Sequence, residues 1–246
     1  MWTKKLTRVE VRRVSNVCVE VIVRYCFKMI WLLLLFFVLL MGGRVIYLIY
    51  SIHKGPRKTV AKRIHPLRTG IVIGSGGHTA EILKLVQNLN SVNYSPRIYI
   101  MASTDTSSEV KIHQTEETHL SRNGSDCYEI VKIPRSRSVG QSYITSVFTT
   151  VFSSLASLPV MLRKRPELIL CNGPGTCIPI CVVGFMMRVL CMTDTRIVFV
   201  ESICRVKTLS LTGKILLLFA DVILVQWPKL QEHYRRTTYI GRLTWL

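Results

Sequence analysis

The chain has 246 residues, of which 49% are hydrophobic, and its formal net charge is +19. That length accommodates one α/β domain of ordinary size and a short additional segment. The positive surplus predicts an anionic partner, but no nucleic-acid-binding motif is present, so nucleic acid is excluded in favour of membrane lipids or a lipid phosphate. The eight cysteines include no Cys-x-x-Cys pair and the six histidines are scattered. We therefore expect no metal site and no cofactor.

The first 68 residues divide into three segments by charge and hydropathy. Residues 1–28 are basic, residues 29–52 carry a single charge at Arg44, and residues 53–68 form a basic linker that contains proline. A spanning helix needs about 20 apolar residues, so 29–52 is predicted to be a single-pass transmembrane anchor. A cleaved signal peptide fits less well, because no small-x-small cleavage site follows. Seven Lys/Arg precede the anchor and six follow it, so the positive-inside rule does not fix its orientation.

From residue 69 to residue 246, short apolar runs alternate with longer helical patterns, as in a doubly wound parallel sheet. This predicts one Rossmann-like α/β domain. The strands are expected at 70–74, 97–102, 127–133, 167–171, 196–201, 221–226 and 237–241. The helices are expected at roughly 78–90, 105–120, 143–164, 177–190, 208–219 and 228–235. The uncharged stretch 138–162 is rich in serine and threonine and contains Pro159. A helix buried on the sheet is the favoured interpretation, with a face against the bilayer as the alternative.

A glycine-rich turn, Gly74-Ser75-Gly76-Gly77, follows the first predicted strand and leads into a helix. Glycines let the backbone turn sharply and approach a ligand closely. The free N–H groups and the positive dipole of a helix N-terminus favour an anion, so a phosphate or diphosphate is the predicted ligand. A tight turn without a ligand is the alternative. The dinucleotide fingerprint would need glycine at Thr79, and no Walker A lysine follows.

Two further loops are expected at the same edge, since ligands of such sheets bind beyond the carboxyl ends of the strands. Arg135 and Arg137 are separated by one residue and lie next to serines. They can clamp a diphosphate, or they belong to a solvated basic loop. Asn172 and Thr176 lie in a Gly/Pro turn after a predicted strand. They can hydrogen-bond a sugar, or they cap the following helix.

Two residues are candidates for catalysis. His78 is predicted at a helix N-terminus, where the dipole disfavours the imidazolium, so a neutral ring can accept a proton. A hydrogen bond that starts the helix is the alternative. Glu201 ends a buried strand, where an acid can bind ligand hydroxyls or pair with Arg205.

Six motifs occur in order, at residues 74–81, 134–137, 172–176, 200–206, 225–228 and 239–242. Together they closely resemble the family of membrane-anchor subunits of the UDP-N-acetylglucosamine transferase that makes chitobiosyl-diphosphodolichol. The resemblance covers about residues 68–243, and the basic segment 1–28 has no counterpart in it. The family looks like the N-terminal, acceptor-binding half of a GT-B glycosyltransferase.

The resemblance implies roles for some of these residues. It implies that Gly76, Gly77 and His78 bind the diphosphate, with His78 as the hypothesised base, and that Asn172, Gly175 and Glu201 contact the acceptor. The residues of the predicted loops themselves add the other candidates for acceptor and diphosphate binding, which are Gly74, Ser75, Arg135, Arg137 and Thr176.

The resemblance also implies two partners, a soluble catalytic subunit that binds UDP-GlcNAc and the lipid acceptor GlcNAc-diphosphodolichol. It places the chain in the endoplasmic reticulum membrane with its domain on the cytosolic face. In the C-terminal tail, Leu243, Trp245 and Leu246 are expected at the partner interface, although an apolar tail suits its own core equally. A GT-B enzyme needs two Rossmann-like domains, and about 180 residues after the linker supply one, so the chain is expected to be inactive alone.

Three other functions stay open at this point. A non-catalytic scaffold would bind the same lipid and the same partner. A bacterial capsule-type half-enzyme would have another acceptor. A nucleotide-dependent oxidoreductase fits least, because position 79 is not glycine.

Overall fold

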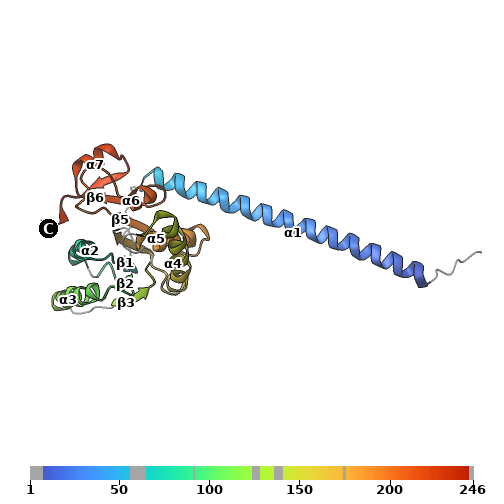
Figure 1. The fold of residues 1–246 in the computed structure, drawn as a ribbon, viewed down its shortest axis with the longest axis horizontal. Coiled ribbons are helices and arrows are strands. Elements are labelled where there is room, and N and C mark those ends of the chain that lie inside the picture. The colour runs from blue at the N-terminus through green and yellow to red at the C-terminus, as the bar shows by residue number, and fades with distance from the viewer. Residues whose placement is uncertain are drawn as a thin grey trace, which may run out of the picture. The chain divides into compact units, whose positions relative to one another are not determined.

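The computed structural model describes residues 8–55, 65–90, 92–123, 128–135, 141–173 and 176–243. The chain forms two units, Met1–Tyr47 and Leu48–Leu246, and Figure 1 shows their elements.

The N-terminal helix α1 runs from Arg8 to His53. It is longer than the predicted anchor, because residues 8–41 contain neither proline nor glycine that would end a helix early. Within α1, the segment Arg24–His53 is long and apolar enough to cross a membrane. Its large side chains, from Tyr25 to Leu40, are exposed. The predicted apolar helix is therefore confirmed as a candidate span.

The second unit contains a seven-stranded sheet in which every neighbouring pair is parallel. The sheet order is β3-β2-β1-β4-β5-β6-β7. The α/β fold class is confirmed, and each strand lies within about two residues of its predicted bounds. The strands are β1 (Thr69–Val72), β2 (Arg97–Ala102), β3 (Tyr128–Ile133), β4 (Leu168–Asn172), β5 (Arg196–Val200), β6 (Val222–Val225) and β7 (Thr237–Tyr239).

Helices cover both faces of this sheet. On one face lie α2 (Gly77–Gln87) and α3 (Thr106–Asn123), and on the other lie α4 (Tyr143–Lys164), α5 (Cys177–Val189), α6 (Leu211–Leu216) and α7 (Pro228–His233). Each face has its own apolar core, because alternate strand residues point to opposite sides. In β1 and just beyond it, Ile71 and Ile73 pack towards α2, and Val72 packs towards α5.

The sheet order creates a switch point between β1 and β4. The chain runs outward from β1 to β2 and β3, then crosses to β4 on the other side of β1. At such a point the loops that follow the two central strands diverge and leave a crevice at the carboxyl edge. The glycine-rich turn follows β1, and the loop with Asn172 follows β4, so both meet at this crevice.

Helix α4 differs from the favoured expectation of a fully buried helix. Ser153, Ser157 and Met161 are fully buried on its inner side. On the other side, Phe148 is 73% exposed and Phe152 is 64% exposed. The sequence pattern predicted the helix and its bounds, but only one of its faces is covered by the fold.

Candidate functional site

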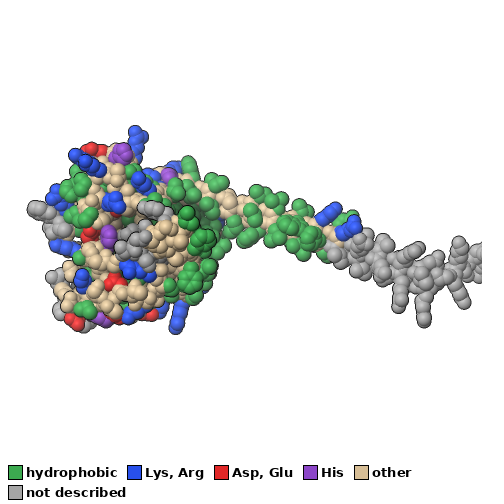
Figure 2. All heavy atoms as spheres, viewed as in Figure 1, with side chains coloured by type: hydrophobic (Ala, Val, Ile, Leu, Met, Phe, Trp, Pro, Cys, Tyr) green, Lys and Arg blue, Asp and Glu red, His purple; other side chains and the backbone are tan. Residues whose placement is uncertain are grey.

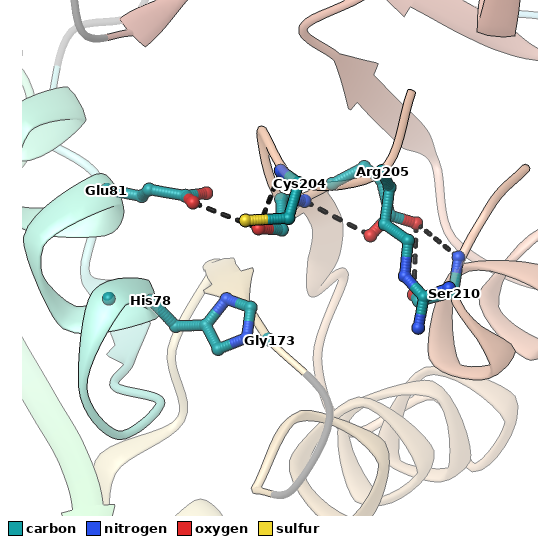
Figure 3. A pocket seen from close by; sticks show the side chains of 9 residues that line it. His78, Glu81, Gly173, Cys204, Arg205 and Ser210 are labelled. Atoms are coloured by element: carbon teal, nitrogen blue, oxygen red, sulfur yellow. Dashed lines mark hydrogen bonds between the residues drawn. The ribbon is translucent and has the colours of Figure 1, made fainter. Parts of the chain in front are cut away.

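A pocket of about 380 Å³ opens at the carboxyl edge of the sheet beside β1 and β4. Its walls come from the start of α2, the loop after β4 and the loop after β5 (Figure 3). His78 and Glu81 project into it from α2. The lining residues are Gly77, His78, Glu81, Gly173, Glu201, Ser202, Cys204, Arg205 and Ser210.

The glycine-rich turn leaves the N-terminus of α2 without a side-chain cap. Gly76 is the N-cap residue of α2, with φ +67°, in the region that favours glycine. No described side chain caps this helix end, so its first N–H groups are available to an anion in the pocket. Thr79 is fully buried, and its Oγ1 donates to the carbonyl oxygen of Gly74 at 2.5 Å. This contact explains why threonine, and not the glycine of a dinucleotide fingerprint, occupies position 79.

His78 is held by two consecutive hydrogen bonds, which connect it through Asn172 to the carboxylate of Glu81. Its Nδ1 lies 2.9 Å from Asn172 Oδ1, and Asn172 Nδ2 donates to Glu81 Oε2 at 2.9 Å. A carboxylate only accepts hydrogen bonds, so the amide nitrogen faces Glu81 and the amide oxygen faces the ring. Nδ1–H therefore donates to Asn172 Oδ1, and Nε2 is the ring nitrogen that this contact leaves uninvolved.

The role of Asn172 in the structure differs from the expected contact with a sugar or cap of the following helix. It is fully buried, and both ends of its amide are engaged by His78 and Glu81. It therefore orients the histidine and does not itself line the pocket.

Glu81 was missed as a site residue, although it ends the first motif. Its two oxygens accept hydrogen bonds from Ser202 Oγ at 3.0 Å, from Asn172 Nδ2, and from Gln226 Nε2 at 3.3 Å. Asn172 is the last residue of β4, and Ser202 and Gln226 follow β5 and β6, so this carboxylate joins three strand ends. The sequence did contain a signal that could have identified Glu81. It comes three residues after His78, and residues three apart share a helix face.

Glu201 lines the pocket but is only 2% exposed. Its oxygens accept from Ser202 N at 3.1 Å, from Ser210 N at 2.8 Å and from Ser210 Oγ at 3.0 Å. Burial raises the pKa of Glu201 above its ordinary value, and the hydrogen bonds from Ser210 and Ser202 oppose that rise. Its hydrogen bonds go to the loop after β5, and no ion pair with Arg205 forms between these two described residues.

Positive charge lies beside the pocket. Arg135 Nη2 is 3.4 Å from Ser75 Oγ, so the loop after β3 reaches the glycine-rich turn. Arg205 is exposed and lines the pocket, although the sequence suggested it only as a partner of Glu201. The predicted residues Arg137 and Gly175 lie outside the described residues.

Two other predicted residues are engaged inside the domain. Thr176 is 4% exposed, and its Oγ1 donates to the carbonyl oxygen of Ile73 at 3.0 Å. It therefore neither caps α5 nor faces the pocket. Leu243 is 1% exposed and packs into the core beside α2. Its side chain is not presented to a partner in this structure, because it packs onto its own domain. Trp245 and Leu246 lie outside the described residues.

Among the described residues, no group of three or more His, Cys, Asp or Glu side chains could hold a metal ion.

Comparison with known proteins adds the family. The model of the family described as "Oligosaccharide biosynthesis protein Alg14 like" matches residues 69–243. This chain belongs to the Alg14-like family. The resemblance carried by the six motifs is thus confirmed.

Curated members of the Alg14-like family match along most of their length. A mouse protein is 51% identical over 181 residues, which are 72% of this chain and 83% of that protein. A Yarrowia lipolytica protein is 39% identical over 212 residues, 86% of this chain and 92% of that protein. Both are named UDP-N-acetylglucosamine transferase subunit ALG14. Among solved structures, MurG from Acinetobacter baumannii has a TM-score of 0.49 at 14% identity, over 71% of this chain and 45% of that chain.

The match to the Alg14-like family includes the pocket. All nine lining residues and the bridging Asn172 lie within residues 69–243, and α1 lies before them.

Proposed function

We propose that this chain is the membrane-anchoring, acceptor-binding subunit of a heteromeric transferase. The complex transfers GlcNAc from UDP-GlcNAc to GlcNAc-diphosphodolichol. The observation that carries this is the His78 ring, held through Nδ1 by Asn172 at a helix N-terminus that has no side-chain cap, in a chain of the Alg14-like family. The names of its relatives supply the donor and the word subunit.

The diphosphate of the acceptor binds at the glycine-rich turn. The first N–H groups of α2 have no side-chain cap among the described residues, and Gly77 and His78 at this helix start line the pocket. Gly76 and Gly77 let phosphate oxygens come close. Arg135 and Arg205 add charge-assisted hydrogen bonds from two sides of the turn. We include Gly175 in this site on the family resemblance, and Arg137 because a single residue separates it from Arg135 in the same basic loop.

His78 acts as the general base. The acceptor hydroxyl attacks the anomeric carbon of UDP-GlcNAc, its proton passes to Nε2, and UDP leaves with the electrons of the broken bond. Glu81 and Asn172 are positioning residues for this step, because they fix the ring and its tautomer. Glu201 is buried in the loop that forms the opposite wall of the pocket, and this burial raises its pKa. We assign to the Glu201 side chain the role of shaping the acceptor site.

The donor is held by a soluble catalytic subunit that docks at the carboxyl edge of the sheet. We place the complex at the cytosolic face of the endoplasmic reticulum, with the apolar part of α1 as the anchor. An anchor keeps the domain close to an acceptor that is confined to the membrane. Trp245 and Leu246 remain our candidates for the partner contact, but Leu243 does not, since it is buried.

The test is a transfer assay with UDP-GlcNAc and a GlcNAc-diphosphate lipid in bilayers, with this chain alone and then with the partner subunit. Transfer only when both are present is the expected result. Transfer by this chain alone would contradict the split enzyme. Recruitment of the partner by a variant that has lost His78, with full turnover, would indicate a scaffold instead.

A further inference from the structure

Helix α4 has a continuous exposed apolar face. Its residues recur at intervals of three and four, the spacing of one side of a helix, and Figure 2 shows hydrophobic side chains gathered over this part of the domain. Exposure ranges from 54% at Val151 to 77% at Ile144. We call this set the α4 apolar face: Ile144, Val147, Phe148, Val151, Phe152 and Leu155.

Three hydroxyls on the flanks of this face are satisfied within the helix. The hydroxyls of Ser146, Thr150 and Ser154 each donate to the carbonyl oxygen four residues earlier, at 2.7, 2.6 and 2.8 Å. A hydroxyl without a partner in an apolar medium costs several kcal/mol, and this pattern removes that penalty. The flanks of the face are therefore compatible with surroundings that offer no hydrogen bonds.

The charge along the sequence around α4 is mostly positive. Between residues 134 and 193 the only acidic residue is Glu167, and the acid that contacts the end of α4 from β3, Glu129, is paired with Lys164. Arg163 and Arg165 are exposed at the C-terminal end of α4, and Arg135 precedes its start. An uncharged apolar stripe with basic residues at its ends suits the interface of an anionic membrane. A protein interface of this size would be expected to have a polar rim along the helix.

The face is also well placed for the pocket. In the parallel sheet, α4 is the next element after β3, which ends at the carboxyl edge, so the helix begins at the sheet edge where the pocket opens. Arg135, between β3 and α4, contacts Ser75 of the glycine-rich turn at 3.4 Å. A bilayer against α4 would thus lie beside the pocket that receives a lipid-linked headgroup.

We propose that the α4 apolar face lies in the interfacial layer of a lipid bilayer, as a second membrane contact besides α1. This rests on the proposed function in one respect, that the chain is held at a membrane. The helix does not span, because Ser153, Ser157 and Met161 are buried in its own domain, although its length and composition would allow crossing. The contact orients the pocket towards the headgroup layer.

The test uses the full chain in nanodiscs of phosphatidylcholine and phosphatidylserine, with the photoreactive residue p-benzoylphenylalanine at one position. Val151 is the test position and Val110 is the matched control. The two valines are 54% and 57% exposed, and Val110 lies on α3, which covers the other face of the sheet. We expect phospholipid adducts, detected by intact-mass spectrometry, at position 151 and not at position 110.

Absence of lipid adducts at 151, or adducts there only with the partner subunit when it is added, would overturn the proposal. The anchor is scored separately, as co-purification of the chain with the discs. A chain that stays on the discs without lipid adducts at 151 therefore refutes the α4 contact alone.

A second variant pair measures the consequence. Val151→Glu should reduce transfer to a long-chain acceptor in the bilayer by roughly fivefold, the order expected for a charge near the membrane interface. Transfer to a short-chain, water-soluble acceptor should be unchanged, and Val110→Glu should leave both rates unaltered. An equal loss with both acceptors would contradict a membrane role, because it would indicate damage to the domain.

Discussion

Helices α2 and α4 both begin at the carboxyl edge of the sheet, yet their first turns are built in opposite ways. The N-cap of α2 is Gly76, which offers no side chain, so no side chain at this position accepts from the leading N–H groups. The N-cap of α4 is Ser142, whose Oγ accepts from Thr145 N at 3.4 Å. An open helix end can take an anion, whereas a closed one cannot. In our proposal, the start of α2 is therefore the polar site that binds the headgroup, whereas α4 contributes an apolar surface that contacts the lipid.

Among the residues that support His78, the largest loss of activity is expected at Gly173, which lies against the histidine ring. Gly173 has φ +97°, and a Cβ there would lie 2.9 Å from His78 Cγ. Gly173→Ala should displace the ring and lower kcat/KM by roughly a hundredfold, the order of a lost general base. Gly241→Ala is the control, since Gly241 also has positive φ (+82°) but no atom within 4 Å of its Cβ position. Equal losses in both variants would assign the effect to backbone strain.

A smaller loss is expected when the carboxylate behind the histidine is neutralised. Glu81→Gln places an amide where Asn172 and Gln226 both donate, so the bridge to His78 loosens. We expect kcat to fall about tenfold with KM for UDP-GlcNAc unchanged, and a change in the pH profile of kcat. Glu109→Gln, which breaks a surface pair with Lys132, should change neither. An unaltered pH profile together with a lower kcat would argue for a merely structural role of Glu81.

The charge at the rim of the pocket should affect binding more than turnover. Arg205→Ala should raise KM for the lipid acceptor by about tenfold, since a charge-assisted hydrogen bond to phosphate is lost. The value of kcat should change little. Lys207→Ala, in the same exposed loop, is the control for net charge. If the two variants raise KM equally, Arg205 acts through the general field and not through contact.

The smallest effect concerns stability. Burial raises the pKa of Glu201 above its ordinary value of 4.5, so the folded chain keeps this proton to a higher pH than the unfolded chain. Stability contributed by this group is present below the ordinary value and is lost as pH rises through the folded value. The midpoint of thermal unfolding of wild type, relative to Glu201→Gln, should therefore fall as pH rises from 4 to 7. A rising difference would contradict the direction, and Glu232→Gln on α7 is the surface control.

The sequence predicted the sheet well, because buried parallel strands are continuous apolar runs between turn residues. Ile71 to Ile73 and Ile197 to Val200 are such runs. The site loops could also be anticipated, since the carboxyl ends of parallel strands share one edge. Three of the predicted residues, Gly77, His78 and Glu201, do line one pocket.

Other features depend on contacts that no local pattern encodes. The bridge from Asn172 to Glu81 joins residues 91 positions apart. Leu243 had two acceptable environments, and the fold places it in the core. The uncharged sequence of 138–162 was compatible with a buried helix or with one face against the bilayer, and it did not say which side of α4 would be covered. The full length of α1 was missed because its basic part lacks the apolar character used to define the anchor.

The central claim is that the pocket contributes chemistry through His78. The most direct measurement is single-turnover transfer by the complex with His78→Ala, after its stoichiometry has been verified, with His113→Ala as control. His113 lies on α3 and contacts Tyr128 away from the pocket. We predict a loss of at least about a hundredfold for His78→Ala and wild-type transfer for His113→Ala. Wild-type transfer by an intact His78→Ala complex would contradict the account.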